Sequence, residues 1–355
     1  MKPVLFVTNH APPARVRPFQ LLHEREGVEF ALFGGRTRHA GVEPADEAGL
    51  PFPHRWVRQR DIRALAASKD FRAVVGGTTG RVALPGAYAG ARRAGVPFVL
   101  WASLWAQPRS LAGMVGALPL RRIYRGADAV ATYGPHVSEY VAARGARNVF
   151  EAPQAVDNDF WSSEVPGTRY APFQVVFIGR LRREKGLLAL IDAWRELGLD
   201  DQGATLVLVG PGPERARAGA TRTTRFVGPA TPVEVRNFYG GADVVVVPSI
   251  PTRTFREPWG LVANEAMNQH LPVIATDAVG AAAGGLVRHE RNGLVVPAGD
   301  RDALAGALRA LHDDPDLRAR LGANAARDVA PYTHAAWAEG FTAALLGATG
   351  QELPC

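Results

Sequence analysis

This sequence contains a single cysteine, Cys355, which is its last residue. A single cysteine excludes an internal disulfide framework and any metal site built from several cysteines. No run of about eighteen or more uncharged apolar residues occurs, which argues against a transmembrane helix. The N-terminal run from Met1 to Val7 has no cleavage-site pattern, so we expect no signal peptide and a cytoplasmic protein.

With 355 residues, 47% hydrophobic and 21% charged, the chain has the length of two domains and the composition of a folded protein. Residues 1–170 hold about 22 Lys and Arg against 14 Asp and Glu, and the remainder about 19 against 20, so the net charge of +7 comes from the first half. A basic half favours an anionic partner: a membrane surface, a lipid phosphate or nucleic acid. The alternative is that abundant arginine reflects a GC-rich genome. We expect peripheral attachment to the inner face of an anionic membrane, and no nucleic acid.

Short apolar runs alternate with helical stretches along the whole chain. Most runs lack period-2 alternation, which is typical of parallel strands buried on both faces. The expected strands are Val4–Thr8, Phe30–Phe33, Ala73–Gly76, Phe98–Trp101, Ala129–Thr132, Val149–Ala152, Gln174–Ile178, Thr205–Val209, Arg225–Val227, Val244–Val247, Val273–Ala275 and Leu294–Val296. The expected helices are Val16–Glu26, Ile62–Ala67, Leu84–Arg93, His136–Ala143, Leu187–Leu197, Pro232–Tyr239, Leu261–Gln269, Asp302–Leu311, Pro315–Asp328 and Ala335–Leu345.

The pattern stops and restarts around a polar stretch after Trp161. In addition, Gly126–Tyr133 in the first half echoes Gly241–Pro248 in the second. We therefore predict an α/β protein of two doubly wound, Rossmann-like domains that face each other across a cleft, with ligands at the carboxyl ends of the strands. The predicted boundaries are 1–161 for the first domain, 162–171 for the linker, 172–332 for the second domain, and 333–355 for a helix that returns to the first domain.

Two glutamates lie eight positions apart across a Pro-Trp-Gly break, Glu257 on a loop and Glu265 in the second turn of the helix that follows. They flank a helix N-terminus, where backbone N–H groups and the helix dipole favour an anion such as phosphate. A phosphate between two carboxylates that bind hydroxyl groups suits a nucleotide sugar. The alternative is that both glutamates are solvated.

A basic turn, Gly179–Gly186, follows the first strand of the second domain. Gly179 ends the strand, and Arg180 and Lys185 lie on the turn into the next helix. A diphosphate needs such charge, with Arg binding as a fork and Lys as a mobile point charge. The alternative is a solvated basic turn.

These motifs, taken with three more, resemble those of the family 4 glycosyltransferases of the GT-B fold. In order they are Gly179–Gly186, Ala242–Ser249, Glu257–Met267, Leu271–Asp277 and Asn292–Asp300. The resemblance is close over most of residues 172–330 and extends to the first domain only in outline. It implies a nucleotide-sugar-dependent hexosyltransferase that retains anomeric configuration and uses no metal or other cofactor.

The resemblance also implies roles for individual residues. Arg180 and Lys185 would neutralise the donor diphosphate, Glu257 would contact the donor sugar, and Glu265 would bind the ribose. The amides of Trp259, Gly260 and Leu261 would hold the phosphate, although the Trp259 ring is also consistent with a core aromatic. The loops at Gly210–Gly212 and Val227–Pro229 would lie near the ribose and base.

The first domain departs from the family pattern in two loops. Asn9–Arg15 replaces a glycine-rich loop, and the stretch Leu100–Trp105 lacks the family's histidine. We expect His10, Ser103 or a tryptophan, Trp101 or Trp105, to take over the missing contact, with His10 favoured as the catalytic group. Arg15 and Arg17 either form a solvated face or meet an anionic acceptor, and Trp101, Ser103 and Trp105 are further candidates for binding the acceptor.

The stretch Asp157-Asn158-Asp159 matches the metal-binding signature of the other large glycosyltransferase fold, but its place before the linker indicates interdomain structure. We expect no metal site. The predicted function is transfer of a sugar from a nucleotide diphosphate to a glycan, a lipid-linked or a small-molecule acceptor. The alternatives are a GT-B nucleotide-sugar epimerase and a binding protein without catalytic activity.

Overall fold

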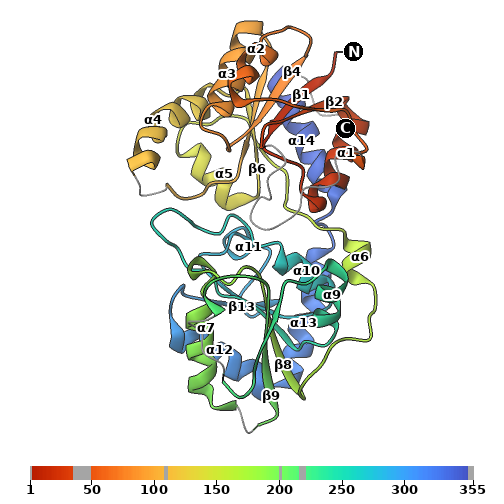
Figure 1. The fold of residues 1–355 in the computed structure, drawn as a ribbon, viewed down its shortest axis with the longest axis vertical. Helices are drawn as coiled ribbons and strands as arrows, with labels where there is room; N and C mark the ends of the chain where they lie inside the picture. The colour runs from red at the N-terminus through yellow and green to blue at the C-terminus, as the bar shows by residue number, and fades with distance from the viewer. Residues whose placement is uncertain (1, 35–48, 108–110, 200–201, 216–220, 351–355) are drawn as a thin grey trace. The chain divides into compact units, whose positions relative to one another are not determined.

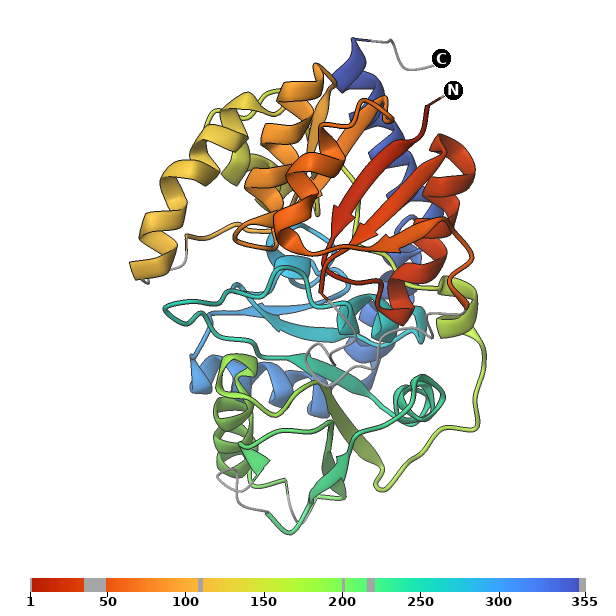
Figure 2. The same cartoon turned by 45° about the horizontal axis from the view of Figure 1, so that its top comes forward.

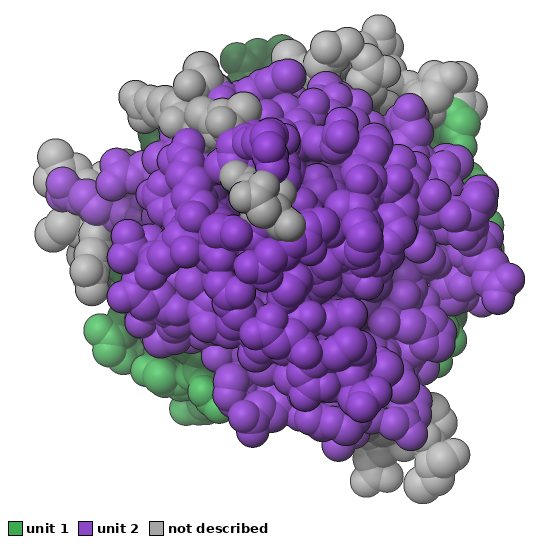
Figure 3. Space-filling model, turned by 90° about the horizontal axis from the view of Figure 1, so that it is seen from below, with its two compact units in different colours: residues 1–154, 333–355 green, residues 155–332 purple. Residues whose placement is uncertain are grey.

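The protein divides into two compact units in a computed structural model that describes residues 2–34, 49–107, 111–199, 202–215 and 221–350, with the backbone alone over 111–118. Unit 1 comprises residues 1–154 and 333–355, and unit 2 comprises residues 155–332 (Figure 3). Cys355 lies outside the described residues.

Unit 1 is built on a seven-stranded sheet of order β3-β2-β1-β4-β5-β6-β7, in which every neighbouring pair is parallel (Figure 1). Its elements are β1 Val4–Thr8, α1 Pro13–Glu26, β2 Val28–Leu32, β3 His54–Trp56, η2 Gln59–Asp61, α2 Ile62–Ala66, β4 Ala73–Gly77, α3 Ala83–Ala94, β5 Phe98–Ala102, α4 Leu111–Gly126, β6 Ala129–Thr132, α5 Pro135–Ala142, β7 Val149–Glu151 and α14 His334–Thr349. The chain order reverses between β1 and β4, so these strands form the topological switch point, where doubly wound sheets bind ligands.

Helices cover both faces of this sheet. Val4 and Phe6 of β1 point to the face covered by α1 and α14, where Phe19 and Trp337 are buried. Leu5 and Val7 point to the other face, with apolar residues of α2, α3, α4 and α5. The C-terminal helix α14 therefore belongs to unit 1 and lies beside α1 (Figures 1 and 2).

Unit 2 repeats this plan with a six-stranded parallel sheet of order β10-β9-β8-β11-β12-β13, whose switch point lies between β8 and β11. Its elements are α6 Asn158–Ser162, β8 Phe173–Ile178, η3 Arg183–Lys185, α7 Leu187–Leu197, β9 Ala204–Val209, β10 Thr224–Gly228, α9 Pro232–Gly240, β11 Val244–Val247, α10 Val262–Asn268, β12 Val273–Thr276, α11 Gly280–Ala283, β13 Gly293–Val296, α12 Arg301–Asp313 and α13 Pro315–Val329. Helices α7, α12 and α13 bury one face, and α9 and α10 contact the strands as well.

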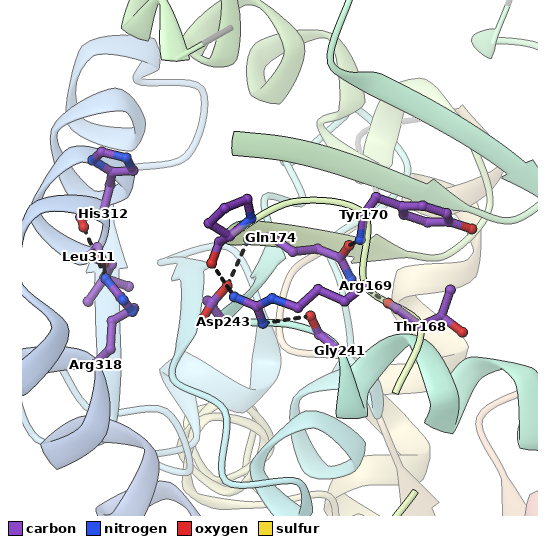
Figure 4. Close-up of polar contacts among 10 residues, drawn as sticks. Thr168, Arg169, Tyr170, Gln174, Gly241, Asp243, Leu311, His312 and Arg318 are labelled. Carbon is purple, nitrogen blue, oxygen red and sulfur yellow. Dashed lines mark hydrogen bonds and ion pairs between the residues drawn. The ribbon is translucent and has the colours of Figure 1, made fainter. Parts of the chain in front are cut away.

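The two matching Gly-Ala-Asp stretches have the same structural role in their units. The Asp128 carboxylate accepts the amide of Phe98 at 2.7 Å and pairs with Arg92 at 3.1 Å. The Asp243 carboxylate accepts the amide of Gln174 and the Arg169 guanidinium, each at 2.7 Å (Figure 4). Each aspartate thus satisfies the otherwise unpaired amide at the start of the adjacent strand.

Figure 4 also shows arginine side chains that donate hydrogen bonds to backbone carbonyls at the ends of neighbouring elements. Arg169 donates to the carbonyl of Gly241 at 3.1 Å, which holds the stretch before β8 against the turn before β11. Arg318 of α13 donates to the carbonyl of His312 at 3.0 Å and to that of Leu311, near the C-terminal end of α12. An arginine at a helix C-terminus satisfies carbonyls that have no partner within the helix.

The prediction of two doubly wound parallel sheets is confirmed, and each predicted strand and helix overlaps one in the structure. The structure adds β3, α4, α6 and α11, which the sequence pattern did not indicate. The division between the units falls after Gln154, so α6 and the stretch 162–171 lie in unit 2. There Arg236 donates to the carbonyl of Phe160 at 2.6 Å, and Gln269 to that of Ser163 at 3.0 Å. None of the described helices is both long and apolar enough to cross a bilayer.

Candidate active site

Three glycine-containing loops meet at the carboxyl ends of β8, β9 and β10 in unit 2. The amide of Gly179 donates to the carbonyl of Val209 at 3.0 Å, and that of Gly210 to the carbonyl of Gly228 at 2.7 Å. A Cβ on Gly210 would lie 2.1 Å from the Gly179 carbonyl oxygen, and a Cβ on Gly212 2.3 Å from that of Leu181. Glycine is therefore required at both positions, because larger residues would separate the loops. Val227, at the end of β10, is exposed.

Lys185 and Glu257 form an ion pair at the switch point of unit 2. The Lys185 ammonium donates to Oε2 of Glu257, and the hydroxyl of Ser249, two residues past β11, donates to the same oxygen at 3.0 Å. Gly186, with φ of 70°, lets the chain turn sharply after Lys185, where a Cβ would meet the Pro248 carbonyl. The loop after β8 and the loop after β11 thus supply one cluster of opposite charges.

Glu257 is buried, with 7% of the residue exposed. Its backbone forms a bridge with Val279, and its carbonyl accepts the amide of Gly280 at 3.1 Å. These contacts fix the loop on which the carboxylate lies. The interpretation of Glu257 as a solvated loop residue is therefore wrong, because both its backbone and its side chain are held. Arg180, by contrast, lies half-buried on the turn after β8.

Trp259 is a core aromatic. It is 3% exposed, its indole donates to the Asn264 side chain at 2.7 Å, and its ring lies 5.9 Å from that of Tyr332 between centroids. Because the Trp259 side chain is buried and bonded to Asn264, a phosphate at the Trp259–Leu261 segment would be held by backbone amides. Gly260, with φ of 93°, and Leu261 lead directly into α10.

Glu265 lies half-buried in α10, where its Oε2 accepts the hydroxyl of Tyr239 at 2.8 Å. Burial raises the pKa of Glu265 from 4.5 to about 7, an effect that the Tyr239 hydrogen bond partly opposes. The Glu265 carboxyl therefore changes charge near neutral pH. The interpretation of Glu265 as a solvated surface residue is wrong.

The residues predicted in the first domain lie in several different environments. His10 is half-buried on the loop after β1. The Ser103 hydroxyl lies 3.2 Å from that of Thr78, and the Trp105 ring packs edge-on against His136 at 5.0 Å. Arg17 is exposed and lies 3.6 Å from Glu24, whereas Arg15 is buried and the half-buried Trp101 ring packs against the core of unit 1. The solvated-face alternative is therefore wrong for Arg15, while Arg17 does lie on an exposed face.

The Asp-x-Asp stretch begins a helix. The Asp157 side chain accepts the amide of Phe160 at 3.1 Å and so caps the N-terminus of α6. Across the described residues, no group of three or more His, Cys, Asp or Glu side chains is placed to hold a metal ion.

The sequence-based reasoning gave no role to several residues that the site contains. Ser249 bonds to Glu257 and Tyr239 to Glu265, and in unit 1 Gln154 and Tyr133 lie against Arg15. Ser249 is the last residue of the Ala242–Ser249 motif and follows a buried strand, and this position could have indicated that Ser249 belongs to the site. Tyr239 gave none, because its partner lies 26 residues away.

Comparison with known proteins finds a family match over the part of unit 2 that holds the charged cluster. Residues 172–314 match the family described as glycosyl transferases group 1. The match covers most of unit 2 and does not extend into unit 1. The matched stretch includes Lys185, Ser249, Glu257 and Glu265.

Two curated relatives agree with this match. The D-inositol 3-phosphate glycosyltransferase of Corynebacterium glutamicum is 36% identical over 180 residues, which cover 46% of this chain and 41% of that protein. The lipopolysaccharide core biosynthesis glycosyltransferase LpsD of Rhizobium meliloti is 36% identical over 158 residues, which cover 42% of each chain. The chain thus matches less than half the length of both relatives.

Solved structures extend the similarity to both units. HepE of Anabaena, determined in complex with UDP and glucose, superposes with a TM-score of 0.73 and 18% identity, covering 96% of this chain and 98% of that one. At this identity the likeness concerns the fold alone. The chain therefore has a GT-B fold, as the sequence predicted, and residues 172–314, which match the group 1 glycosyl transferases, lie in its second unit.

Proposed function

We propose that this protein is a glycosyltransferase that moves a sugar from a nucleotide diphosphate to a hydroxyl group of an acceptor. The observation that carries the proposal is the Lys185–Glu257–Ser249 cluster at the β8–β11 switch point of a group 1 glycosyltransferase domain. This is the edge of a doubly wound sheet where nucleotides bind. A nucleotide sugar needs a cation for its diphosphate and a fixed hydrogen-bond acceptor for its sugar hydroxyls, and the cluster supplies both.

Each residue has a defined task in the proposed reaction. Arg180 and Lys185 bind the diphosphate and stabilise its charge as the bond from the anomeric carbon to the diphosphate oxygen breaks. Glu257, held by Lys185 and Ser249, accepts hydrogen bonds from the donor sugar. Glu265 faces the ribose hydroxyls, and the amides of Gly260 and Leu261 hold a phosphate oxygen.

The new bond forms between the acceptor oxygen and the anomeric carbon on the face that the diphosphate leaves. The acceptor proton passes to the departing diphosphate oxygen, which makes the protein a retaining enzyme without its own nucleophile. Positioning and electrostatic stabilisation then supply the catalysis, and we expect no metal requirement. His10 is the first-domain group that we assign to the donor sugar.

A panel of nucleotide sugars tests this proposal. One or more of UDP-, GDP- and ADP-sugars should raise the melting temperature, because a ligand that binds the folded state stabilises it by mass action. Transfer to water or to an added acceptor should then release the nucleoside diphosphate. Formation of an epimer without an acceptor would favour the epimerase alternative, and binding without any turnover would favour the binding protein.

We also propose that unit 1 attaches to anionic membranes. An open groove in unit 1 is lined by Arg58, Gln59, Arg60, Arg81 and Val82. Val82 is 54% exposed, so an apolar side chain lies among three cations, a combination that suits a lipid surface. Sedimentation with phosphatidylglycerol vesicles at low salt, and release at high salt, is the expected result. Failure to sediment at low salt would contradict it.

A further inference from the structure

Arg15 is a buried cation at the carboxyl edge of the unit 1 sheet. It lies in the first turn of α1, and only 8% of the residue is exposed. Nη2 of its guanidinium donates to the side-chain oxygen of Gln154. The guanidinium carbon lies 5.6 Å from the centroid of the Trp101 ring and 5.8 Å from that of Trp337.

Three N–H groups of this cluster lack an acceptor. Nη1 of Arg15 and the indole nitrogens of Trp101 and Trp337 are buried and have no hydrogen-bond partner among the described residues. The two indole rings also contact each other edge-on at 6.0 Å. A buried donor without an acceptor costs on the order of 1–3 kcal/mol, so native proteins rarely leave three together.

The charge of Arg15 has no anionic counterpart. No ion pair joins it to any carboxylate that the structure describes, and its neighbours are two aromatic rings, an amide and the Tyr133 phenol. Burial lowers the pKa of Arg15, while Tyr133 beside it acts in the opposite direction. Arginine nevertheless stays charged in proteins, and contacts with aromatic faces offset only part of the cost of burying it.

The cluster lies where this fold binds ligands. Arg15 follows β1, while Ser103, Tyr133 and Gln154 follow β5, β6 and β7. Thr78, after β4, shares a hydrogen bond with Ser103. These loops surround the β1–β4 switch point, and α1 presents its N-terminus there with no acidic residue in its first turn.

We propose that unit 1 contains a phosphate site in which Arg15 and the indole N–H groups of Trp101 and Trp337 bind the oxygens of a phosphate group, and that this group belongs to the acceptor. The second part rests on the proposed glycosyltransferase function. Three donors on three side chains match a phosphate, which offers at least three acceptor oxygens, better than a carboxylate, which offers two.

Binding of inorganic phosphate, measured by isothermal titration calorimetry, tests the site directly. Arg15→Gln should weaken binding at least tenfold. Trp101→Phe, which deletes one N–H and keeps an aromatic ring, should weaken it severalfold. The control Arg25→Gln, on the same helix but paired with Glu339 at 3.0 Å, should match the wild type. Lys185→Ala should keep the Arg15-dependent affinity, because it changes only unit 2.

Competition against bound phosphate identifies its source. Displacement by glycerol 3-phosphate indicates a soluble phosphate ester, and displacement by phosphatidic acid but not phosphatidylcholine vesicles indicates a lipid phosphate; either supports the proposal. Displacement by neither overturns the assignment to an acceptor. Unchanged phosphate affinity in folded Arg15→Gln, or in Trp101→Phe if Arg15→Gln does not fold, overturns the site itself.

The same samples are titrated with UDP, GDP and ADP to separate this proposal from the function. Nucleotide binding without phosphate binding would leave the function standing and remove the unit 1 site. Phosphate binding that depends on Arg15, without binding of any nucleotide, would leave the site standing and remove both the transferase function and the assignment to an acceptor.

Discussion

Each unit places a cation near its switch point, but within the described parts of the chain only the cation of unit 2 is paired with a carboxylate. In unit 2 the Lys185 ammonium is paired with the Glu257 carboxylate, which Ser249 also holds. In unit 1 the Arg15 guanidinium lies among two indole rings and the amide of Gln154. A buried charge that has a counterion is compensated within the fold, whereas a buried charge without one costs free energy that a bound anion would offset. On the two proposals above, the repeated fold would recognise an anion in two different ways.

Removing the counterion of Lys185 gives the largest expected effect. In Glu257→Gln we expect turnover of a nucleotide sugar to fall by about 10²–10³-fold, because the group that orients the sugar is lost while the diphosphate is still bound. The affinity for the nucleoside diphosphate should hold or increase, since Lys185 then lacks its internal partner. Lys185→Ala should lose both turnover and diphosphate affinity.

Steady-state kinetics and calorimetry on the same preparations check these variants. Arg183→Gln is the matched control, because Arg183 lies exposed on the same short 3-10 turn as Lys185 and should leave both quantities within about twofold of the wild type. Full turnover in Glu257→Gln would contradict the role assigned to this carboxylate.

The Glu265 carboxylate has a neutral partner, the Tyr239 hydroxyl. Titration of Glu265 should therefore change the free energy of unfolding with pH. With a pKa of about 7 in the folded state against 4.5 when unfolded, the folded protein keeps a proton that the unfolded chain releases. The free energy of unfolding should therefore fall as pH rises from about 4.5 to 7, by up to about 3 kcal/mol at ~1.4 kcal/mol per pKa unit.

Urea unfolding at several pH values measures this loss. Glu265→Gln should show a correspondingly smaller decrease across the window. Tyr239→Phe should extend the decrease to higher pH, because the Tyr239 hydrogen bond lowers the pKa of Glu265. Identical pH profiles in wild type and Glu265→Gln would mean that this carboxyl titrates normally.

Asp128 and Asp243 occupy the same position in the two Gly-Ala-Asp stretches. Replacing each one tests whether the two aspartates contribute equally to the free energy of unfolding. Asp243→Ala should lower the free energy of unfolding by about 2–3 kcal/mol, since it leaves the amide of Gln174 and the guanidinium of Arg169 without this acceptor. Asp128→Ala should cost about 1–2 kcal/mol, because its side chain is more exposed, 30% against 16%, and its contact with Arg92 is longer. Chemical denaturation of both variants measures the difference; a larger loss in Asp128→Ala would reverse the comparison.

Much of the fold could be predicted because buried parallel strands are continuous apolar runs. Val244–Val247, for example, was predicted with its observed bounds. Strand β3, His54–Trp56, was missed because a three-residue edge strand with polar residues carries no such pattern. Helix α4 was not predicted; its internal Pro119 weakens the helical pattern, although Val16–Glu26 was predicted despite Pro18.

The site could be predicted only in part, because pairing and burial are tertiary properties. The motifs identified Lys185 and Glu257 separately, but their ion pair joins residues 72 positions apart. Arg15 and Arg17 look alike in the sequence, yet two positions on a helix turn the side chain to a different face. One is therefore buried at the switch point and the other is exposed beside Glu24.

The smallest expected effect concerns Asp157, a carboxylate whose partner is a backbone amide. Asp157→Ala removes the cap of α6 and should lower the free energy of unfolding by about 1 kcal/mol. Asp159→Ala, the control from the same Asp-x-Asp stretch, should cost less, because its exposed side chain does not provide this cap. Turnover in both variants should match the wild type with and without EDTA, since a helix cap has no part in the proposed reaction. If instead both variants lost turnover and added Mn²⁺ restored it, the stretch would be a metal site, and the charge on the diphosphate would not rest on Arg180 and Lys185 alone.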